Sequence, residues 1–228
     1  MKTKLKWILT GIMVLAIIIL CKKMQDYIAS SNVVENKIVV IDPGHGADDP
    51  GKVGVNGEIE KVINLQIAQK VKEKLEKEGV TVVMTREDDQ GLYDDTVSNK
   101  KRADMEKRVA LINETNPEVV VSIHQNSFSD SSVRGPQVFY HTESKAGQQF
   151  ATAMQEELWL AAPEHKRQIK GNNSYYILKY TEAPTIIVEC GFLSNEEEAK
   201  MLLEDSYQET MAQAICLGII KWVDKSTE

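Results

Sequence analysis

The sequence predicts a single α/β domain in which a mostly parallel sheet of about six strands is flanked by helices. Short apolar runs alternate with longer segments of helical periodicity, an order typical of strand–helix–strand units. Three runs, at 37–41, 119–123 and 185–188, are almost continuously apolar, which indicates strands buried on both faces of a parallel sheet. The chain has 228 residues, 42% of them hydrophobic and 27% charged. One globular domain accounts for that length and composition.

The elements follow one another in a regular order. Short apolar runs rich in β-branched residues, bounded by turn residues, predict the strands. These are Lys37–Ile41, Thr81–Thr85, Val119–Ile123, Gln137–Tyr140, Tyr175–Leu178 and Thr185–Val188. Apolar residues spaced three and four apart predict the helices between and after them. These are Glu58–Glu78, Lys101–Glu114, Lys145–Leu160 and Asp205–Val223. Gly79 supports the end of the first helix, because glycine readily takes the left-handed conformation that follows a helix.

Residues 1–29 are expected to form a membrane anchor. Lysines flank the uncharged run Trp7–Cys21 on both sides. That run would rise only about 22 Å as a helix, so a signal peptide is the rival interpretation. No small-residue cleavage pattern follows it, and the flanking lysines can extend the span by snorkelling. We therefore expect a single-pass protein of the cell membrane, with a linker at 30–36 and an exported catalytic domain at 37–225.

The charge balance excludes nucleic acid as a partner. The chain has 27 basic and 34 acidic residues, and residues 30–228 keep 22 and 33 of them. The resulting net charge of −11 leaves no basic stripe for a phosphate backbone. The cysteines Cys21, Cys190 and Cys216 lie in the anchor, a strand end and a helix. They form no disulfide framework, so the domain depends on its core for stability.

Four polar residues are expected to meet at one edge of the sheet. His45 follows the first strand, His124 ends the strand 119–123, and Glu189 ends the strand 185–188. The carboxyl ends of parallel strands share one edge, where ligands bind in open α/β sheets. Glu60 lies near the start of the first helix, on the face that carries its buried apolar stripe. A carboxylate in that position needs a cation or strong hydrogen bonds.

These residue types predict a zinc site. Two histidines and a glutamate supply nitrogen and oxygen ligands for Zn²⁺, and catalytic sites leave a fourth position to water. A second carboxylate beside that water would act as general base and then as general acid. Glu189 is the candidate, although spacing alone does not distinguish this role from ligation. No compact H-E-x-x-H pattern is present.

Each residue also has a structural interpretation. His45 could belong only to a glycine loop, Glu60 could complement the helix dipole, and His124 could be a hydrogen-bonded core residue. Glu189 could pair with a buried base, but 185–195 contains no Arg or Lys. A phosphate cradle in the loop 42–57 is disfavoured, since its aspartates would repel an anion and the P-loop pattern is absent. The expected convergence of all four residues favours the metal site.

Four ordered motifs resemble those of the zinc-dependent N-acetylmuramoyl-L-alanine amidases of bacterial cell walls, the third amidase family. The motifs are DPGHG (42–46), EKVINL (60–65), SIHQNS (122–127) and ECGFLSN (189–195). The resemblance covers 37–222 and implies a six-stranded fold related to zinc exopeptidases. It also implies Zn²⁺ ligation by His45, Glu60 and His124, with Glu189 as the catalytic glutamate. The implied reaction is hydrolysis of the peptidoglycan amide that joins the lactyl group of N-acetylmuramic acid to L-alanine.

Some features of the sequence indicate which members of this family the chain is most similar to. Ala47, Gln125 and Ser127 depart from the usual family residues, which affects substrate preference more than metal binding. Some family members carry a long helical insert that blocks the metal site. Here only residues 128–136 separate SIHQNS from the next strand, which is too short for such an insert. The compact chain is similar to the germination-specific spore cortex amidases of this family, which act in muramic-δ-lactam formation. That similarity implies a site in the forespore intermembrane space, and the absence of a wall-binding module leaves room for an exported protein partner that controls activity.

Three alternative functions stay open at this stage. A vegetative autolysin would share the chemistry of a cortex amidase. A zinc exopeptidase would act on free stem peptides, as the related fold allows. An inactive scaffold that binds glycan is disfavoured by the complete set of polar residues.

Overall fold

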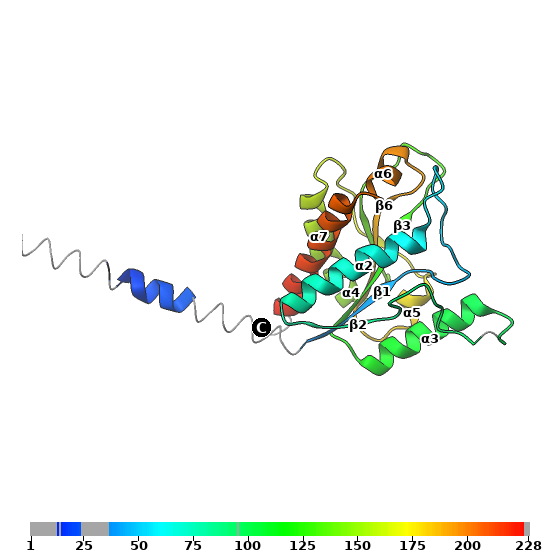
Figure 1. The fold of residues 1–228 in the computed structure, drawn as a ribbon. Helices are drawn as coiled ribbons and strands as arrows, with labels where there is room; N and C mark the ends of the chain where they lie inside the picture. Colours follow the sequence, from blue (N-terminus) through cyan, green and yellow to red (C-terminus); the bar gives the residue numbers. More distant parts are fainter. Residues whose placement is uncertain (1–12, 14, 24–36, 95, 226–228) are drawn as a thin grey trace, which may run out of the picture.

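The computed structural model describes residues 13, 15–23, 37–94 and 96–225. Six strands form one sheet in the order β2-β1-β3-β6-β4-β5 (Figure 1). The strands are β1 (Ile38–Pro43), β2 (Thr81–Met84), β3 (Val119–Asn126), β4 (Gln137–Tyr140), β5 (Lys170–Gly171) and β6 (Thr185–Phe192). The first three strands and β6 are mutually parallel, whereas β4 runs antiparallel to β6. The predicted six-stranded, mostly parallel sheet is therefore confirmed.

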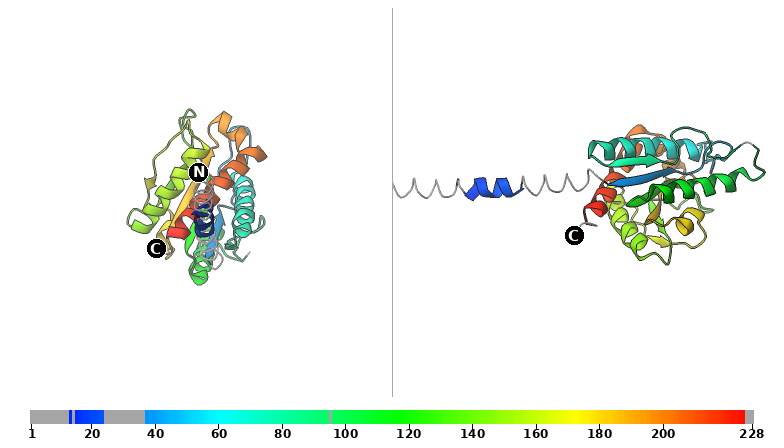
Figure 2. Two further views of the ribbon diagram at one scale, coloured as in Figure 1. Left: turned by 90° about the vertical axis from the view of Figure 1, so that its left-hand side faces the viewer. Right: turned by 90° about the horizontal axis from the view of Figure 1, so that it is seen from below.

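Helices cover both faces of this sheet. They are α2 (Glu60–Lys77), α3 (Lys100–Thr115), α4 (Lys145–Ala161), α5 (Tyr176–Tyr180), α6 (Glu196–Met201) and α7 (Asp205–Lys225). The larger core cluster joins α2, α4 and α7 to one face, and the smaller cluster joins α3 and α5 to the other. Figure 2 shows α2 and α3 on opposite sides of β1. The central strands are buried on both faces, as their continuous apolar sequences predict.

The sequence-based element boundaries differ from the structure by a few residues, with one error of type. The run Tyr175–Leu178 was expected as a strand, but the chain forms the helix α5 there. The backbone N–H of Lys179 donates to the carbonyl of Tyr175, and that of Thr181 donates to the carbonyl of Ile177. So short an apolar run has no periodicity that separates a strand from a buried helical turn. The short elements β5 and α6 were not expected.

The predicted membrane location is corrected by the structure. Within the described part of the chain, no helix is both long enough and apolar enough to cross a membrane. The prediction of a single-pass protein of the cell membrane is therefore wrong. The rest of the predicted anchor and the linker, at 1–12, 14 and 24–36, lies outside the described residues.

Candidate metal centre

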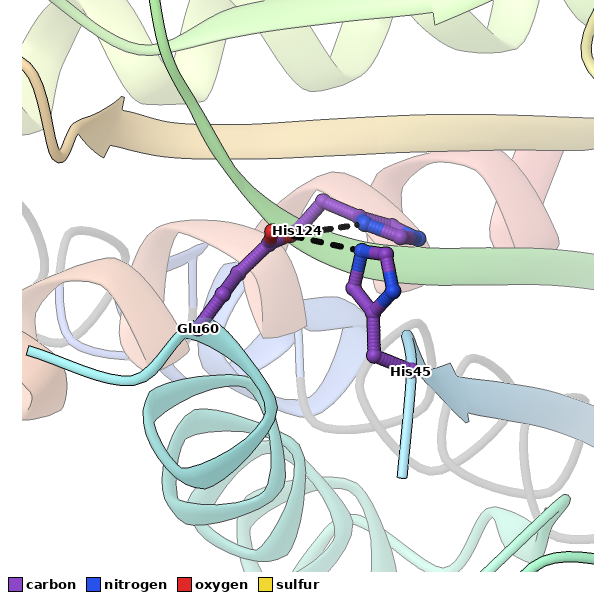
Figure 3. Close-up of side chains that lie close together, drawn as sticks. All are labelled: His45, Glu60 and His124. Atoms are coloured by element: carbon purple, nitrogen blue, oxygen red, sulfur yellow. Dashed lines mark hydrogen bonds and ion pairs between the residues drawn. The ribbon is translucent and has the colours of Figure 1, made fainter. Parts of the chain in front are cut away.

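The four predicted site residues meet at the carboxyl edge of the central strands. His45 lies in the loop after β1, Glu60 is the first residue of α2, and His124 lies on β3. Glu189 lies on β6, where it pairs in register with His124. Figure 3 shows the imidazoles of His45 and His124 next to each other, both joined to the Glu60 carboxylate. Four separate segments of the chain thus bring their polar groups to one edge of the sheet.

The Glu60 carboxylate bridges the two histidines. Its Oε1 lies 2.9 Å from Nδ1 of His124, and its Oε2 lies 3.2 Å from Nε2 of His45. One nitrogen of each histidine and one oxygen of Glu60 all lie within 4.8 Å of one another. Two imidazole nitrogens and one carboxylate oxygen are a donor set suited to Zn²⁺. The three residues could therefore hold a metal ion.

Electrostatics favour a cation between these side chains. Glu60 is almost fully buried, and burial acts to raise the pKa of its carboxyl. Hydrogen bonds to His124 and His45 outweigh that effect and hold the pKa far below its ordinary range. Burial also acts to lower the pKa of His45, but its contacts with Glu60 and Asp49 raise the pKa above the ordinary value. The buried carboxylate thus keeps its charge and draws positive charge to the cluster.

A further ring of contacts orients the cluster. Nδ1 of His45 lies 2.9 Å from Oδ2 of Asp49, and the ionised carboxylate can only accept a hydrogen bond. Nδ1 therefore donates to Asp49, and Nε2 on the other side of the ring faces Glu60, the arrangement that carboxylates impose on metal-binding histidines. On the other side, the backbone N–H of Gln125 donates to Oε1 of Glu60 at 3.1 Å. The side chain of Asn64 donates to the carbonyl of Gly44 at 3.1 Å.

The loop after β1 requires glycine where it approaches the cluster. A Cβ atom on Gly44 would lie 2.2 Å from Nε2 of His124, and one on Gly51 would lie 2.5 Å from Oε2 of Glu60. Gly51 also has a φ of +70°, and His45 itself has a φ of 62°. A non-glycine residue in this left-handed region is uncommon, and such conformations concentrate at functional sites. The strained loop places the His45 imidazole opposite His124.

Two buried arginines, Arg86 and Arg108, bind the loop after β1 through hydrogen bonds. Arg108 on α3 donates from Nη1 to Oδ1 of Asp42 at 2.7 Å and from Nη2 to the carbonyl of His45 at 2.6 Å. Arg86 donates to the carbonyls of Pro43 and Gly44. Burial acts to raise the pKa of Asp42, but the Arg108 charge and several hydrogen bonds lower it to about 2. The backbone carbonyls of the loop are therefore fixed by charge-assisted hydrogen bonds.

Glu189 occupies a different environment from Glu60. Its side chain is 7% exposed, and no group among the described residues hydrogen-bonds its Oε2 atom. Burial and the negative charge of Glu60 raise the pKa of Glu189 well above its ordinary value. Burial and the same two carboxylates also raise the pKa of the Tyr175 hydroxyl. A buried carboxyl with a raised pKa beside a cation site is suited to accept and return a proton.

The comparison with known proteins identifies the family. Residues 39–221 match the Amidase_3 family, described as N-acetylmuramoyl-L-alanine amidase. The chain belongs to this family. It is therefore an amidase of peptidoglycan, as the sequence motifs predict.

Several members of this amidase family are similar over nearly all of their length. The germination-specific N-acetylmuramoyl-L-alanine amidase of Bacillus subtilis is 32% identical over 97% of this chain and 96% of that protein. The structure of the CwlD amidase from Clostridioides difficile, solved in complex with the GerS lipoprotein, has a TM-score of 0.81 at 37% identity. It covers 85% of this chain and all of that one. The catalytic domain of CwlV from Bacillus (Paenibacillus) polymyxa has a TM-score of 0.73 at 33% identity, over 82% and 98% of the chains.

Sequence reasoning missed the residues that support this amidase site. Asp49 and Arg86 lie in loops and Arg108 lies on a helix, where no sequence pattern marks a supporting role. Only Asp49 carries a signal, since it lies four residues after His45, but a loop has no fixed spacing from which contact follows. The arginines resemble ordinary surface charges in the sequence, yet both are at least 95% buried.

Proposed function

We propose that this amidase depends on zinc, with His45, Glu60 and His124 as its ligands and Glu189 as its catalytic glutamate. The observation that supports this assignment is the pairing of the His–Glu–His cluster with a buried carboxyl on the adjacent strand. Two histidines and a glutamate match the ligands that zinc takes in proteins. The carboxyl of Glu189 already lies at the same edge of the sheet, on the strand next to His124. The catalytic unit is proposed to comprise residues 37–225.

The substrate bond is the amide between the lactyl group of N-acetylmuramic acid and L-alanine. When bound, zinc supplies a Lewis acid that polarises a carbonyl and lowers the pKa of water. Glu189 takes the proton of the attacking water as the oxygen bonds to the lactyl carbonyl carbon. The same carboxyl then gives that proton to the alanine nitrogen as the C–N bond breaks. Asp49 and the Gln125 backbone hold His45 and Glu60 in place during both steps.

The biological role proposed is maturation of the spore cortex, in which peptide-free muramic acid forms δ-lactam needed for germination. Its support is the full-length similarity to the germination-specific amidase of Bacillus subtilis and to CwlD. Because CwlD was solved with the GerS lipoprotein, an exported protein partner that controls activity is part of this proposal. A vegetative role is the alternative, since LytC of Bacillus subtilis is 32% identical over 84% of this chain. Cortex lacking δ-lactam in spores without this protein would support the first role.

The decisive experiment incubates the zinc-loaded chain with peptidoglycan and analyses the soluble products by mass spectrometry. We expect intact stem peptides with a free alanine amine, together with peptide-free muramic acid. Release of alanine from free stem peptides, without cleavage of peptidoglycan, would instead identify an exopeptidase. Inactivity of the zinc-loaded chain, with and without its partner, would contradict the proposal.

The role of Glu189 is tested by Glu189→Gln. The amide keeps the size of the side chain but cannot accept the proton, so kcat is expected to fall by about 10²- to 10⁴-fold. Zinc content, measured by atomic absorption, should stay at one ion per chain. His124→Ala is the comparison variant and should lose both zinc and activity. Loss of zinc in Glu189→Gln would make Glu189 a ligand instead.

A further inference from the structure

A groove opens beside the metal centre, between α3 and α5. The two helices lie side by side on the sheet face opposite α2 (Figure 1). The groove has a volume of about 520 Å³, and none of the proposed site residues lines it. It is lined by Asn99, Lys101, Arg102, Met105, Tyr176 and Tyr180. It is therefore a separate recess, next to the reaction centre but outside it.

The lining is basic, although the whole chain is acidic. The chain carries a net charge of −7, yet the described residues that line the groove include two cations and no carboxylate. The side chain of Arg102 is 72% exposed, and its Nε atom pairs with Glu106 at 2.7 Å. That pair uses one edge of the guanidinium, whose planar fork has five N–H donors. Nζ of Lys101 pairs with Asp49 at 2.9 Å, so the other N–H donors of the exposed Arg102 guanidinium are the groups that can bind an anion in the groove.

Two tyrosines form the opposite wall. The rings of Tyr176 and Tyr180 lie 4.4 Å apart between centroids and are tilted by 45°. Tyr180 is 47% exposed. Paired tyrosines offer apolar ring surface together with hydroxyl groups, which suits an extended peptide chain.

Two sets of contacts link the walls of the groove to the reaction centre. On the α3 side, Nζ of Lys101 lies 2.9 Å from Oδ2 of Asp49, and the same oxygen contacts His45. On the α5 side, the helix begins directly after Tyr175, and the Tyr175 ring packs on Phe139 of β4. Phe139 lies two residues after Gln137, the residue of β4 that pairs with Glu189. These contacts place the groove beside the metal centre, within reach of a substrate held there.

We propose that the groove binds the stem peptide of the substrate, and that Arg102 pairs with a free carboxylate of that peptide. This inference rests on the proposed amidase reaction and adds that the groove binds the peptide part of the substrate. Stem peptides carry free carboxylates, whereas the glycan strand carries mainly hydroxyl and amide groups. Arginine binds carboxylates through two parallel hydrogen bonds, which fixes the orientation of the ligand. The groove would thereby set which side of the scissile amide faces Glu189.

The test measures binding of a stem peptide by isothermal titration calorimetry with the full, zinc-loaded chain. The probe is L-alanyl-γ-D-glutamyl-diaminopimelate, and the comparison ligand is the same tripeptide with its carboxylates amidated. We expect Arg102→Gln to weaken binding of the charged tripeptide by about three- to fivefold, the upper range for an exposed ion pair. The amidated tripeptide should bind equally to the two proteins.

Glu106→Gln is the matched control. It breaks the same ion pair within α3 but leaves the guanidinium charge in place, so binding of the charged tripeptide should not weaken. An equal loss in both variants would show that Arg102 acts only through the helix, and it would overturn the proposal. Unchanged tripeptide binding in Arg102→Gln would also overturn it. The proposal is equally overturned if peptide-free glycan oligomers, rather than the tripeptide, depend on Arg102.

The kinetic readout separates this inference from the proposed function. In Arg102→Gln, KM for muropeptide is expected to rise by about the same three- to fivefold, with kcat unchanged. Peptide release by the wild-type chain with no change in Arg102→Gln would reject the groove alone. Tripeptide binding that depends on Arg102, without any peptide release, would reject the reaction but keep the groove as a peptide site.

Discussion

Ala47 and His45 both lie in the left-handed backbone region in the loop that presents the metal centre. Ala47 has a φ of 48°, and its Cβ makes this conformation cost roughly 1 kcal/mol relative to glycine. The backbone N–H of Ala47 donates to the carbonyl of Asp89, and its carbonyl accepts from Nζ of Lys61. The strain at this residue is therefore maintained by contacts outside the loop.

Ala47→Gly is expected to raise the free energy of unfolding by about 0.5 kcal/mol or more, since it removes the Cβ strain and keeps both backbone contacts. Urea denaturation of the two proteins measures this change. Ala110→Gly, at an exposed position within α3, is the matched control and should lower stability by about 1 kcal/mol. A loss of stability in both variants would show that the loop conformation is not strained.

Asp42 provides a pH-dependent contribution to stability. Its pKa is about 2 in the folded protein against an ordinary 3.8, so the folded state binds its proton less readily than the unfolded state. The contribution is fully present above pH 4 and is lost as the pH falls towards 2. It amounts to roughly 2 kcal/mol. Asp42→Asn should therefore lower stability at pH 7 by about 3 kcal/mol, because Arg108 loses a buried partner.

The measurement is chemical denaturation of both proteins at several values between pH 2 and pH 5. The difference in unfolding free energy between wild type and Asp42→Asn should shrink as the pH falls. A constant difference across that range would contradict the assigned pKa of Asp42.

At the scale of elements, the site depends on how closely the β1 loop packs against β3. Gly44 lies against the imidazole of His124 with no room for a Cβ atom. Gly44→Ala is therefore expected to displace His124 and to reduce zinc content by about tenfold or more, as small displacements of ligands and their supports do. Zinc per chain, measured after dialysis, checks this. Gly57→Ala is the control, because its φ of +94° would strain an alanine but the added Cβ would meet no atom within 4 Å. That variant should lose stability and keep its zinc.

The element scale also separates what periodicity predicts from what packing decides. Helix α2 was predictable, since its buried stripe of Ala68, Val71 and Leu75 repeats at helical spacing and extends to Glu60. Helix α5 was not, because Ile177 and Leu178 bury equally well in a strand or in a helical turn. The turn before α5 favours the helix. There the side chain of Asn172 accepts hydrogen bonds from the backbone N–H groups of Ser174 and Tyr175.

For the whole molecule, a bound ion would join three separate segments of the chain. The loop after β1, the start of α2 and the end of β3 each supply one candidate ligand. Zinc that binds only the folded state stabilises it by about 2.7 kcal/mol at a concentration 100 times its Kd. For a domain of this size the corresponding rise in Tm is about 5–10 °C.

Thermal unfolding followed by circular dichroism, with zinc and after removal of zinc by a chelator, measures this shift. His124→Ala should unfold at the same temperature with and without zinc. Equal Tm values for the wild-type chain in both conditions would contradict the assignment of the cluster as a zinc site.

The amino-acid sequence by itself determined the order of the longer strands and helices and the edge at which His45, Glu60, His124 and Glu189 gather. It did so because the carboxyl ends of parallel strands share one edge whatever the side chains do. Only the tertiary structure decided which groups support those residues. Arg86 and Arg108 act through contacts between distant segments, Asp49 acts through the fold of its own loop, and Arg102 gains a role only where α3 meets α5. Such contacts depend on distances in space, for which spacing along the chain carries no signal.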